Sequence, residues 1–146
     1  MRIDIQKITE GEESVVIRYI EPNPVVDRIS GILNGQNNRL WGKAEGRSIG
    51  VDPDEILYLE SVDDAVFAYT EEHVLRLDHT LSSFMLEWGD ESYFRCSKSM
   101  VININKVVSL KSLSSNRIDA TMEGGEHIII SRRYASEFRR ILKGDR

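Results

Sequence analysis

Short segments in which apolar and polar side chains alternate, separated by turn residues, run through most of this sequence and favour a mainly β fold. They are residues 40–43, 48–51, 56–61, 65–70, 73–77, 94–103, 107–113, 117–122 and 127–130. Such alternation places one row of side chains on each face of a sheet. Asp63-Asp64 and Gly124-Gly125 lie between neighbouring segments and predict the turns of two hairpins, since glycine tolerates the positive φ of tight turns.

Three further segments have the period of a helix. Asn23 can cap a helix that begins at Pro24, and Gly35 can end it. Thr80 can cap a second helix, in which the apolar row is Leu81, Phe84, Met85 and Trp88. Ser131 can cap a last helix, in which the apolar row is Tyr134, Phe138, Ile141 and Leu142. With so few and such short helices, we expect a mainly β protein of the α+β class.

The amino-terminal part has its own pattern. Residues 2–8 and 15–20 alternate like strands and are followed by the helix at Pro24. We therefore predict a small β-β-α appendage over residues 1–44, and a second, larger domain over residues 45–146. The appendage is a candidate for dimerisation or for docking of an inhibitor.

Charge is distributed unevenly along the 146 residues. The chain has 19 basic and 24 acidic residues, a net charge of -5, which by itself argues against a polyanionic ligand. The net charge is nevertheless 0 for residues 1–44, -11 for residues 45–94 and +6 for residues 95–146. This asymmetry predicts a dipolar molecule whose last segment suits a polyanion, although charges unevenly scattered over solvated faces would give the same numbers.

Several classes of function lack support in the sequence. The single cysteine, Cys96, excludes an internal disulfide framework and suits a reducing compartment, where we expect it to be a structural thiol. The three histidines have no metal-ligand spacing, and no set of residues suggests catalysis, so we expect no enzyme, cofactor, metal or small-molecule substrate. No apolar run reaches the length of a signal peptide or a membrane span, which predicts a cytoplasmic protein.

Two places combine basic and hydroxyl side chains. Ser131-Arg132-Arg133 stands where a strand passes into a helix, and the unpaired N–H groups of a helix start attract anions. Ser97-Lys98-Ser99 offers two hydroxyls and an ammonium group to a phosphate backbone. A solvated helix start, with the arginines paired to Glu137 or other nearby acids, is the alternative interpretation.

Three motifs resemble the LytTR family of bacterial DNA-binding domains in order and spacing. They are Ile56-Leu57-Tyr58-Leu59-Glu60-Ser61, Phe94-Arg95-Cys96-Ser97-Lys98-Ser99-Met100-Val101-Ile102-Asn103 and Ile130-Ser131-Arg132-Arg133-Tyr134. The resemblance covers roughly residues 45–146. It implies an elongated arrangement of small sheets that inserts loops into successive major grooves of promoter DNA and regulates transcription.

The resemblance also implies roles for individual residues. Lys98 and Arg133 match base-contacting positions, while Ser97, Ser99 and Arg132 match phosphate or accessory contacts. Arg95 is assigned to the same DNA-binding surface. Many family members have histidine at the position of Ser97 and a polar or basic contact in the loop that holds Asp63-Asp64 here, which implies a different preference for DNA sequence.

The 44 residues before the resemblance are too few for a phosphoacceptor receiver. The chain is therefore similar to short stand-alone LytTR regulators, some of which a membrane protein holds in check, and a homodimer on double-stranded DNA is expected. A β-rich protein-interaction module that binds an acidic partner through the same basic face is the alternative function.

Overall fold

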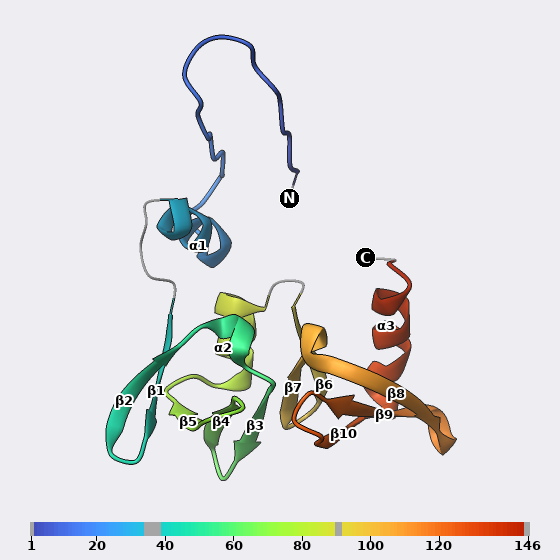
Figure 1. Ribbon diagram of the computed structural model, residues 1–146. Helices are drawn as coiled ribbons and strands as arrows, with labels where there is room; N and C mark the ends of the chain where they lie inside the picture. Colours follow the sequence, from blue (N-terminus) through green and yellow to red (C-terminus); the bar gives the residue numbers. More distant parts are fainter. Residues whose placement is uncertain (1, 34–38, 90–91, 145–146) are drawn as a thin grey trace.

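The computed structural model describes residues 2–33, 39–89 and 92–144. These residues form ten β-strands and three α-helices, so the mainly β, α+β class is confirmed (Figure 1). The strands are β1 (Leu40–Ala44), β2 (Arg47–Val51), β3 (Tyr58–Val62), β4 (Ala65–Tyr69), β5 (Val74–Leu77), β6 (Tyr93–Ser97), β7 (Met100–Asn103), β8 (Val107–Leu113), β9 (Arg117–Met122) and β10 (His127–Ile130). The helices are α1 (Pro24–Leu33), α2 (Leu81–Trp88) and α3 (Arg132–Leu142), with short 3-10 turns η1 (Pro53–Glu55), η2 (Ile104–Lys106) and η3 (Ser114–Asn116).

The strands form two antiparallel sheets. The larger has the order β2-β1-β5-β4-β3-β7-β6 and the smaller the order β10-β9-β8. Both predicted hairpins are present, as β3–β4 and β9–β10. Asp63 and Asp64 have φ values of 50° and 64°, the left-handed backbone that a two-residue turn matching the twist of its strands requires.

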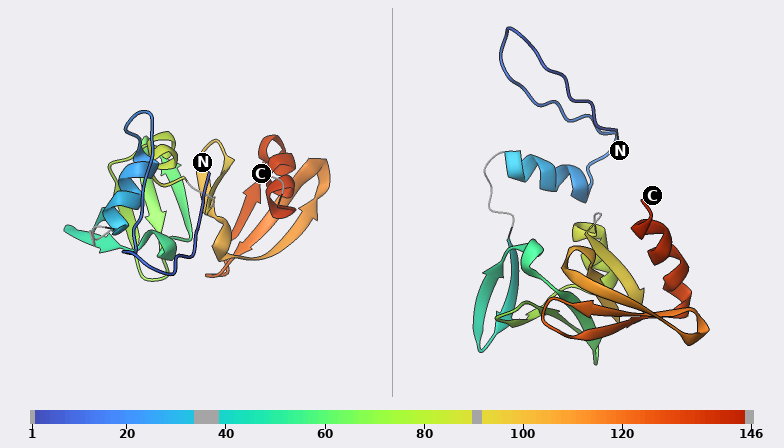
Figure 2. Two further views of the ribbon diagram at one scale, coloured as in Figure 1. Left: turned by 90° about the horizontal axis from the view of Figure 1, so that it is seen from above. Right: turned by 45° about the vertical axis from the view of Figure 1, so that its right-hand side comes forward.

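Each sheet contributes to its own hydrophobic core. The first core lies between the larger sheet and α2, around Leu59, Phe84 and Val101. The second core joins the smaller sheet to α3 around Met122, Ile130 and Phe138. The two parts lie side by side when the molecule is seen from above (Figure 2).

The hairpin β6–β7 belongs to both cores. Tyr93 and Val101 point into the first core, whereas Phe94, Cys96 and Ile102 point into the second. Successive side chains of a strand face opposite sides, so the alternation of this hairpin fixes the position of one core relative to the other. The β6–β7 hairpin therefore lies between the two halves of the domain.

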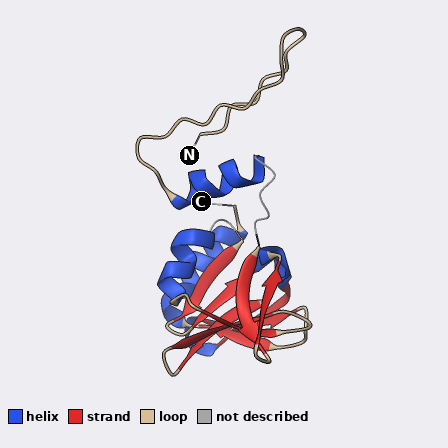
Figure 3. Cartoon of the chain, turned by 90° about the vertical axis from the view of Figure 1, so that its left-hand side faces the viewer, coloured by secondary structure: helices blue, strands red, loops and turns tan. Residues whose placement is uncertain are grey.

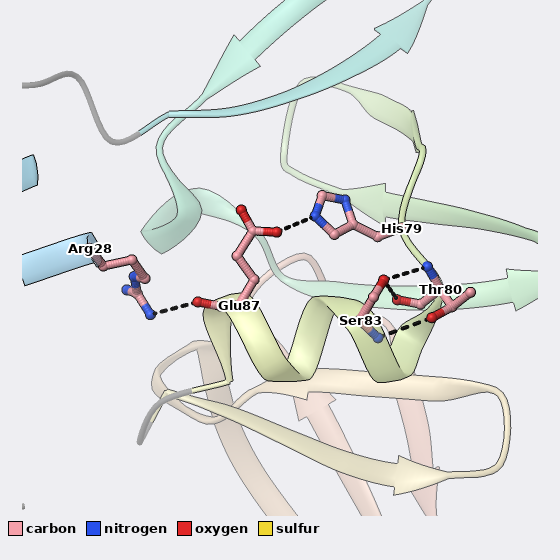
Figure 4. A network of polar contacts seen from close by, with 5 residues as sticks. All are labelled: Arg28, His79, Thr80, Ser83 and Glu87. Carbon is pink, nitrogen blue, oxygen red and sulfur yellow. Dashed lines mark hydrogen bonds and ion pairs between the residues drawn. The ribbon is translucent and has the colours of Figure 1, made fainter. Parts of the chain in front are cut away.

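The helix α2 begins as the sequence predicts and supports α1 (Figure 4). Thr80 and Ser83 exchange hydrogen bonds of a capping box, with Ser83 N donating to Thr80 Oγ1 at 3.0 Å. At the other end, the Arg28 guanidinium of α1 lies 4.9 Å from the Trp88 ring centroid and donates to the Glu87 carbonyl oxygen. Cation–π contact thus docks α1 on the carboxyl end of α2.

The prediction of a β-β-α appendage is wrong in its strands. Asn23 caps α1 as expected, since its Oδ1 accepts a hydrogen bond from Val26 N at 3.0 Å. Residues 2–23 contain no strand. They form a loop that precedes α1 and extends away from the sheets (Figure 3). The predicted helix end at Gly35 lies outside the described residues.

The larger sheet begins before the expected domain boundary at residue 44. The strand β1 pairs along its length with β2 and meets β5 where Lys43 faces Arg76. Leu40 is buried in the first core. The larger sheet therefore includes residues before residue 45. The pairing of β1 with β5, which lies far from it in sequence, makes β1 part of this sheet.

Candidate nucleic-acid interface

The tip of the β6–β7 hairpin holds the first predicted group of site residues. Ser97 is paired with Met100, so Lys98 and Ser99 form a two-residue turn. The Ser97 hydroxyl accepts a hydrogen bond from Ser99 N at 3.3 Å. Lys98 and Ser99 are exposed and Ser97 is half-buried. Within the described residues Lys98 makes no ion pair, so its ammonium group is available to an anion.

Arg95 supports this turn from behind. Its Nη2 donates to the Lys98 carbonyl oxygen at 2.6 Å and its Nε to the Ser97 carbonyl oxygen at 3.3 Å. Its Nη1 donates to the Ser82 hydroxyl at 3.3 Å, which ties the turn to the first turn of α2. The fork of the guanidinium serves several acceptors at once. In this conformation Arg95 orients Lys98 instead of presenting its own charge.

The amino terminus of α3 holds the second predicted group. Ser131 precedes the helix, and its carbonyl oxygen accepts hydrogen bonds from the backbone N–H groups of Tyr134 and Ala135, both at 3.0 Å. Its hydroxyl makes no capping hydrogen bond. The N–H groups of a first helical turn have no partner within the helix, so this end presents open donors at the positive end of the dipole.

Arg132 and Arg133 extend from this helix start and are exposed. The predicted alternative, in which they pair with Glu137, is not found, because Glu137 lies 3.9 Å from Arg140 instead. Across the described residues neither Arg132 nor Arg133 makes an ion pair. The Arg133 guanidinium carbon lies 5.5 Å from the Tyr134 ring centroid, a contact that orients the side chain without neutralising its charge.

Two backbone hydrogen bonds bring these groups to one side of the domain. Ser131 N donates to the Cys96 carbonyl oxygen at 2.9 Å, which joins the start of α3 to the end of β6. Ser61 N donates to the Ser99 carbonyl oxygen at 2.8 Å, which joins the β3–β4 hairpin to the β6–β7 turn. The carboxyl end of α3 points toward the N-terminal segment (Figure 1). The start of α3, and with it this side of the domain, faces the opposite way. The two basic motifs, more than thirty residues apart in sequence, form one surface with the acidic turn Asp63-Asp64 at its border.

Sequence reasoning missed the continuation of this surface along α3. Arg139 donates through Nη1 to the side-chain oxygen of Asn116, and the Asn116 amide donates to the Ser136 hydroxyl at 3.4 Å. The turn between β8 and β9 is thereby held against the helix. Arg132, Arg139 and Lys143 are seven and then four residues apart, a spacing that places them on one helical face. This spacing is visible in the sequence and could have predicted a basic face on α3.

Cys96 is a structural residue in the second core, as predicted. It is fully buried, and its thiol donates to the Met100 carbonyl oxygen at 3.6 Å. Burial raises the pKa of the Cys96 thiol to about 12, so the group stays protonated at neutral pH. Since the thiolate is the nucleophilic form, this cysteine is inert beside the basic surface.

A family model of the LytTr DNA-binding domain matches residues 46–143. The chain belongs to the LytTR family. The membership predicted from the three motifs is thus confirmed, and LytTR is a family of DNA-binding domains, not of enzymes.

The chain is similar to a named regulator and to a solved domain. The chain is 26% identical over 92 residues to the sensory transduction protein LytT of Bacillus subtilis, a match that spans 63% of this chain and 38% of LytT. A solved LytTr DNA-binding domain from Bacillus cereus has a TM-score of 0.69 and 25% identity, and the likeness covers 73% of this chain and 97% of that domain. The LytTR arrangement of sheets in this chain is therefore that of a solved family member.

In residues 2–33, 39–89 and 92–144, no cluster of three or more histidine, cysteine, aspartate or glutamate side chains could hold a metal ion. No helix in the described part of the chain is long and apolar enough to cross a membrane. The candidate site of the LytTR domain is the basic surface that holds Lys98 and Arg133.

Proposed function

We propose that this LytTR protein binds promoter DNA in a sequence-specific manner and regulates transcription. The proposal rests on Lys98 and Arg133, which lie on one side of a domain that belongs to a DNA-binding family. Both side chains are exposed, and neither makes an ion pair in the described structure. The Ser131–Cys96 hydrogen bond holds the two motifs together. The function requires the compartment that holds the DNA, which we propose is the cytoplasm.

The surface offers two kinds of contact. Lys98 and Arg133 would enter the major groove, where arginine can donate two parallel hydrogen bonds to guanine O6 and N7. Ser97, Ser99 and Arg132 would bind phosphates on either side, assisted by the open N–H groups at the start of α3. Phosphate contacts fix the register of the protein on DNA, and base contacts supply the sequence preference.

A titration by fluorescence anisotropy tests this proposal. We expect the full chain to prefer the promoter upstream of its own reading frame over scrambled DNA of equal length. The logarithm of affinity should fall linearly with the logarithm of salt concentration, with a slope of about -0.9 for each phosphate neutralised. No binding to either DNA at low salt would contradict the proposal and favour an acidic protein as the partner.

The acidic turn at the border of the surface should weaken DNA binding. Replacing Asp63 and Asp64 with asparagine removes two negative charges and keeps a residue type that tolerates the observed positive φ values. With the turn beside the DNA in the proposed complex, each removed charge lessens the repulsion of nearby phosphates, so we expect affinity to rise roughly two-fold per charge at moderate salt. The same titration measures this on promoter and scrambled DNA, which should gain equally. An unchanged affinity would place the β3–β4 turn away from the DNA.

The binding of two partners by the proposed regulator stays a prediction. A homodimer on DNA follows from the expectation that two copies occupy repeated half-sites. A membrane-protein inhibitor is implied for some short family members, and the exposed N-terminal segment would leave such a partner a surface that the DNA does not use.

A further inference from the structure

The outer face of β1 carries an exposed aromatic ring between two cations. Arg39, which directly precedes β1, Trp41 and Lys43 occupy alternate positions, and alternate side chains of a strand point to the same face. Leu40 points to the opposite face, into the first core. Trp41 is 60% exposed, and Arg39 and Lys43 are exposed as well. The β1–β2 hairpin ends the larger sheet on the side away from the second core (Figure 1), so this face is open to a ligand.

The Trp41 ring lies flat against the neighbouring strand. Trp41 is paired with Gly50 of β2, and a Cβ atom added at Gly50 would lie 3.0–3.1 Å from the ring atoms Cη2, Cζ2 and Cε2. These nearly equal distances place that Cβ position above the ring plane, so the ring rests face-on on the glycine. The Arg39 Nη1 donates to the Gly50 carbonyl oxygen at 2.8 Å, which holds this cation beside the ring. One face of the indole is thus supported by the protein and the other is turned to solvent.

Lys43 faces another cation across the sheet. Its partner in the register of β1 with β5 is Arg76, and directly opposite side chains have Cβ atoms about 5 Å apart. Like charges in such a pair destabilise a sheet. Both side chains are exposed, and within the described chain neither makes an ion pair, even though Asp78 follows Arg76 on the same face. The pair therefore presents two positive charges to an anion from outside.

Two further side chains extend the row of Lys43 and Arg76. Ser48 of β2 is the partner of Lys43 and adds an exposed hydroxyl. Phe67 of β4 is the partner of Arg76 and is half-buried, so part of its ring is accessible. Glu60 of β3 is the next residue of the row and lies beyond Phe67 from the cations. The outer face of β1, β5 and β4 is thus an aromatic platform with a positively charged centre.

An open aromatic face beside unpaired cations matches single-stranded nucleic acid. Its bases stack on aromatic side chains, and its phosphates bind basic side chains. A duplex has no use for the open face of Trp41, because its bases are stacked on one another and present only their edges in the grooves. Alternate residues of a strand are about 7 Å apart, which sets a cation on each side of the ring, within reach of the phosphates that flank a stacked base.

We propose that this face binds single-stranded nucleic acid, with one base stacked on Trp41 and phosphates held by Arg39, Lys43 and Arg76. Stacking and phosphate binding are common to single-stranded DNA and RNA. In the larger sheet, β5, β4 and β3 lie between β1 and β7, so this surface is separate from the one that includes the β6–β7 turn. Single-strand binding does not rest on the proposed promoter function.

Tryptophan fluorescence of the full chain tests the stacking. The titrants are oligothymidylate and oligouridylate of about ten nucleotides, within the site sizes of single-strand binding surfaces. The chain has two tryptophans, and Trp88 is buried, so stacking on Trp41 should quench the emission of the exposed ring. Trp41→Ala should weaken binding roughly 5- to 150-fold, the range for one stacked base. Trp41→Phe keeps a ring and should retain most of the affinity. The strand that binds more tightly identifies the sugar that the surface accepts.

Removing one cation tests the phosphate contacts. Lys43→Ala should reduce the steepness of the salt dependence by about 0.7, the value for one phosphate of a single strand. The same change relieves the opposition to Arg76, so the temperature of thermal unfolding should be equal or higher. Lys111→Ala, which removes an exposed lysine from β8, is the matched control and should leave the salt dependence unchanged. A salt dependence that Lys43→Ala leaves unchanged would overturn the phosphate contact.

The two surfaces can be tested independently. Lys98→Ala and Arg133→Ala should weaken binding of the promoter duplex and leave quenching by single strands intact, whereas Trp41→Ala should do the reverse. Absence of quenching, or an unchanged affinity of Trp41→Ala for both single strands, would overturn the proposal and favour an acidic protein segment as the ligand. Promoter binding by the wild-type chain would stand in that case. Equal weakening of duplex and single-strand binding by Trp41→Ala would also overturn the proposal and make this face part of the promoter surface.

Discussion

Replacing Phe138 with alanine should lower the free energy of unfolding by about 3–5 kcal/mol, the usual cost of truncating a fully buried aromatic residue. Phe138 has no exposed surface, and its ring centroid lies 5.2 Å from that of Phe94. The ring is the main apolar anchor of α3 in the second core, so its loss leaves a cavity between the helix and β6. Urea denaturation of the variant and the wild-type protein measures the difference.

A half-exposed residue of the same helix provides the control. Leu142, near the end of α3, is 49% exposed, so Leu142→Ala should cost less than half as much. The Phe138→Ala variant should also bind DNA more weakly, because the start of α3 carries Arg132 and Arg133. If both variants lost equal stability, α3 would not be held by the second core.

The hairpins and α2 could be predicted because their signals are local. A turn, a cap and the side-chain period lie within a few residues for β3–β4, β9–β10 and α2. Residues 15–20 carry an equally clear strand pattern, yet they form no strand in one chain. Strand propensity describes a fit to a pleated, half-buried surface, and here the surface is missing. The strand prediction for residues 15–20 failed because these residues pair with no strand of the described chain.

In the candidate site, too, features that depend on neighbouring residues in the sequence could be predicted, whereas contacts between distant residues could not. The motifs around Lys98 and Arg133 were visible in the sequence, since each combines charge with a turn or a helix start. The bracing of Lys98 by Arg95 depends on a backbone geometry that no pattern encodes. The contact of Arg139 with Asn116 joins residues on a helix and on a distant turn. Such positioning contacts require the fold, because they depend on how the two sheets are placed.

Replacing Arg133 with alanine should reduce affinity for the promoter far more than affinity for scrambled DNA. A bidentate contact to guanine contributes about 1–3 kcal/mol of discrimination, which corresponds to roughly 5- to 150-fold. The exposed guanidinium, oriented over the Tyr134 ring, has the freedom and the charge for that contact. Anisotropy titrations of both DNAs at one salt concentration measure the ratio.

The adjacent arginine separates the two roles. Arg132→Ala should weaken binding to both DNAs by similar factors and reduce the steepness of the salt dependence by about 0.9, as expected for one lost phosphate contact. Arg133→Lys keeps the charge but removes the planar fork, so it should retain affinity for scrambled DNA and lose the preference for the promoter. Equal losses on both DNAs for Arg133→Ala would show that Arg133 contacts only phosphate. The base-reading role would then pass to Lys98, which the same pair of titrations on Lys98→Ala would test.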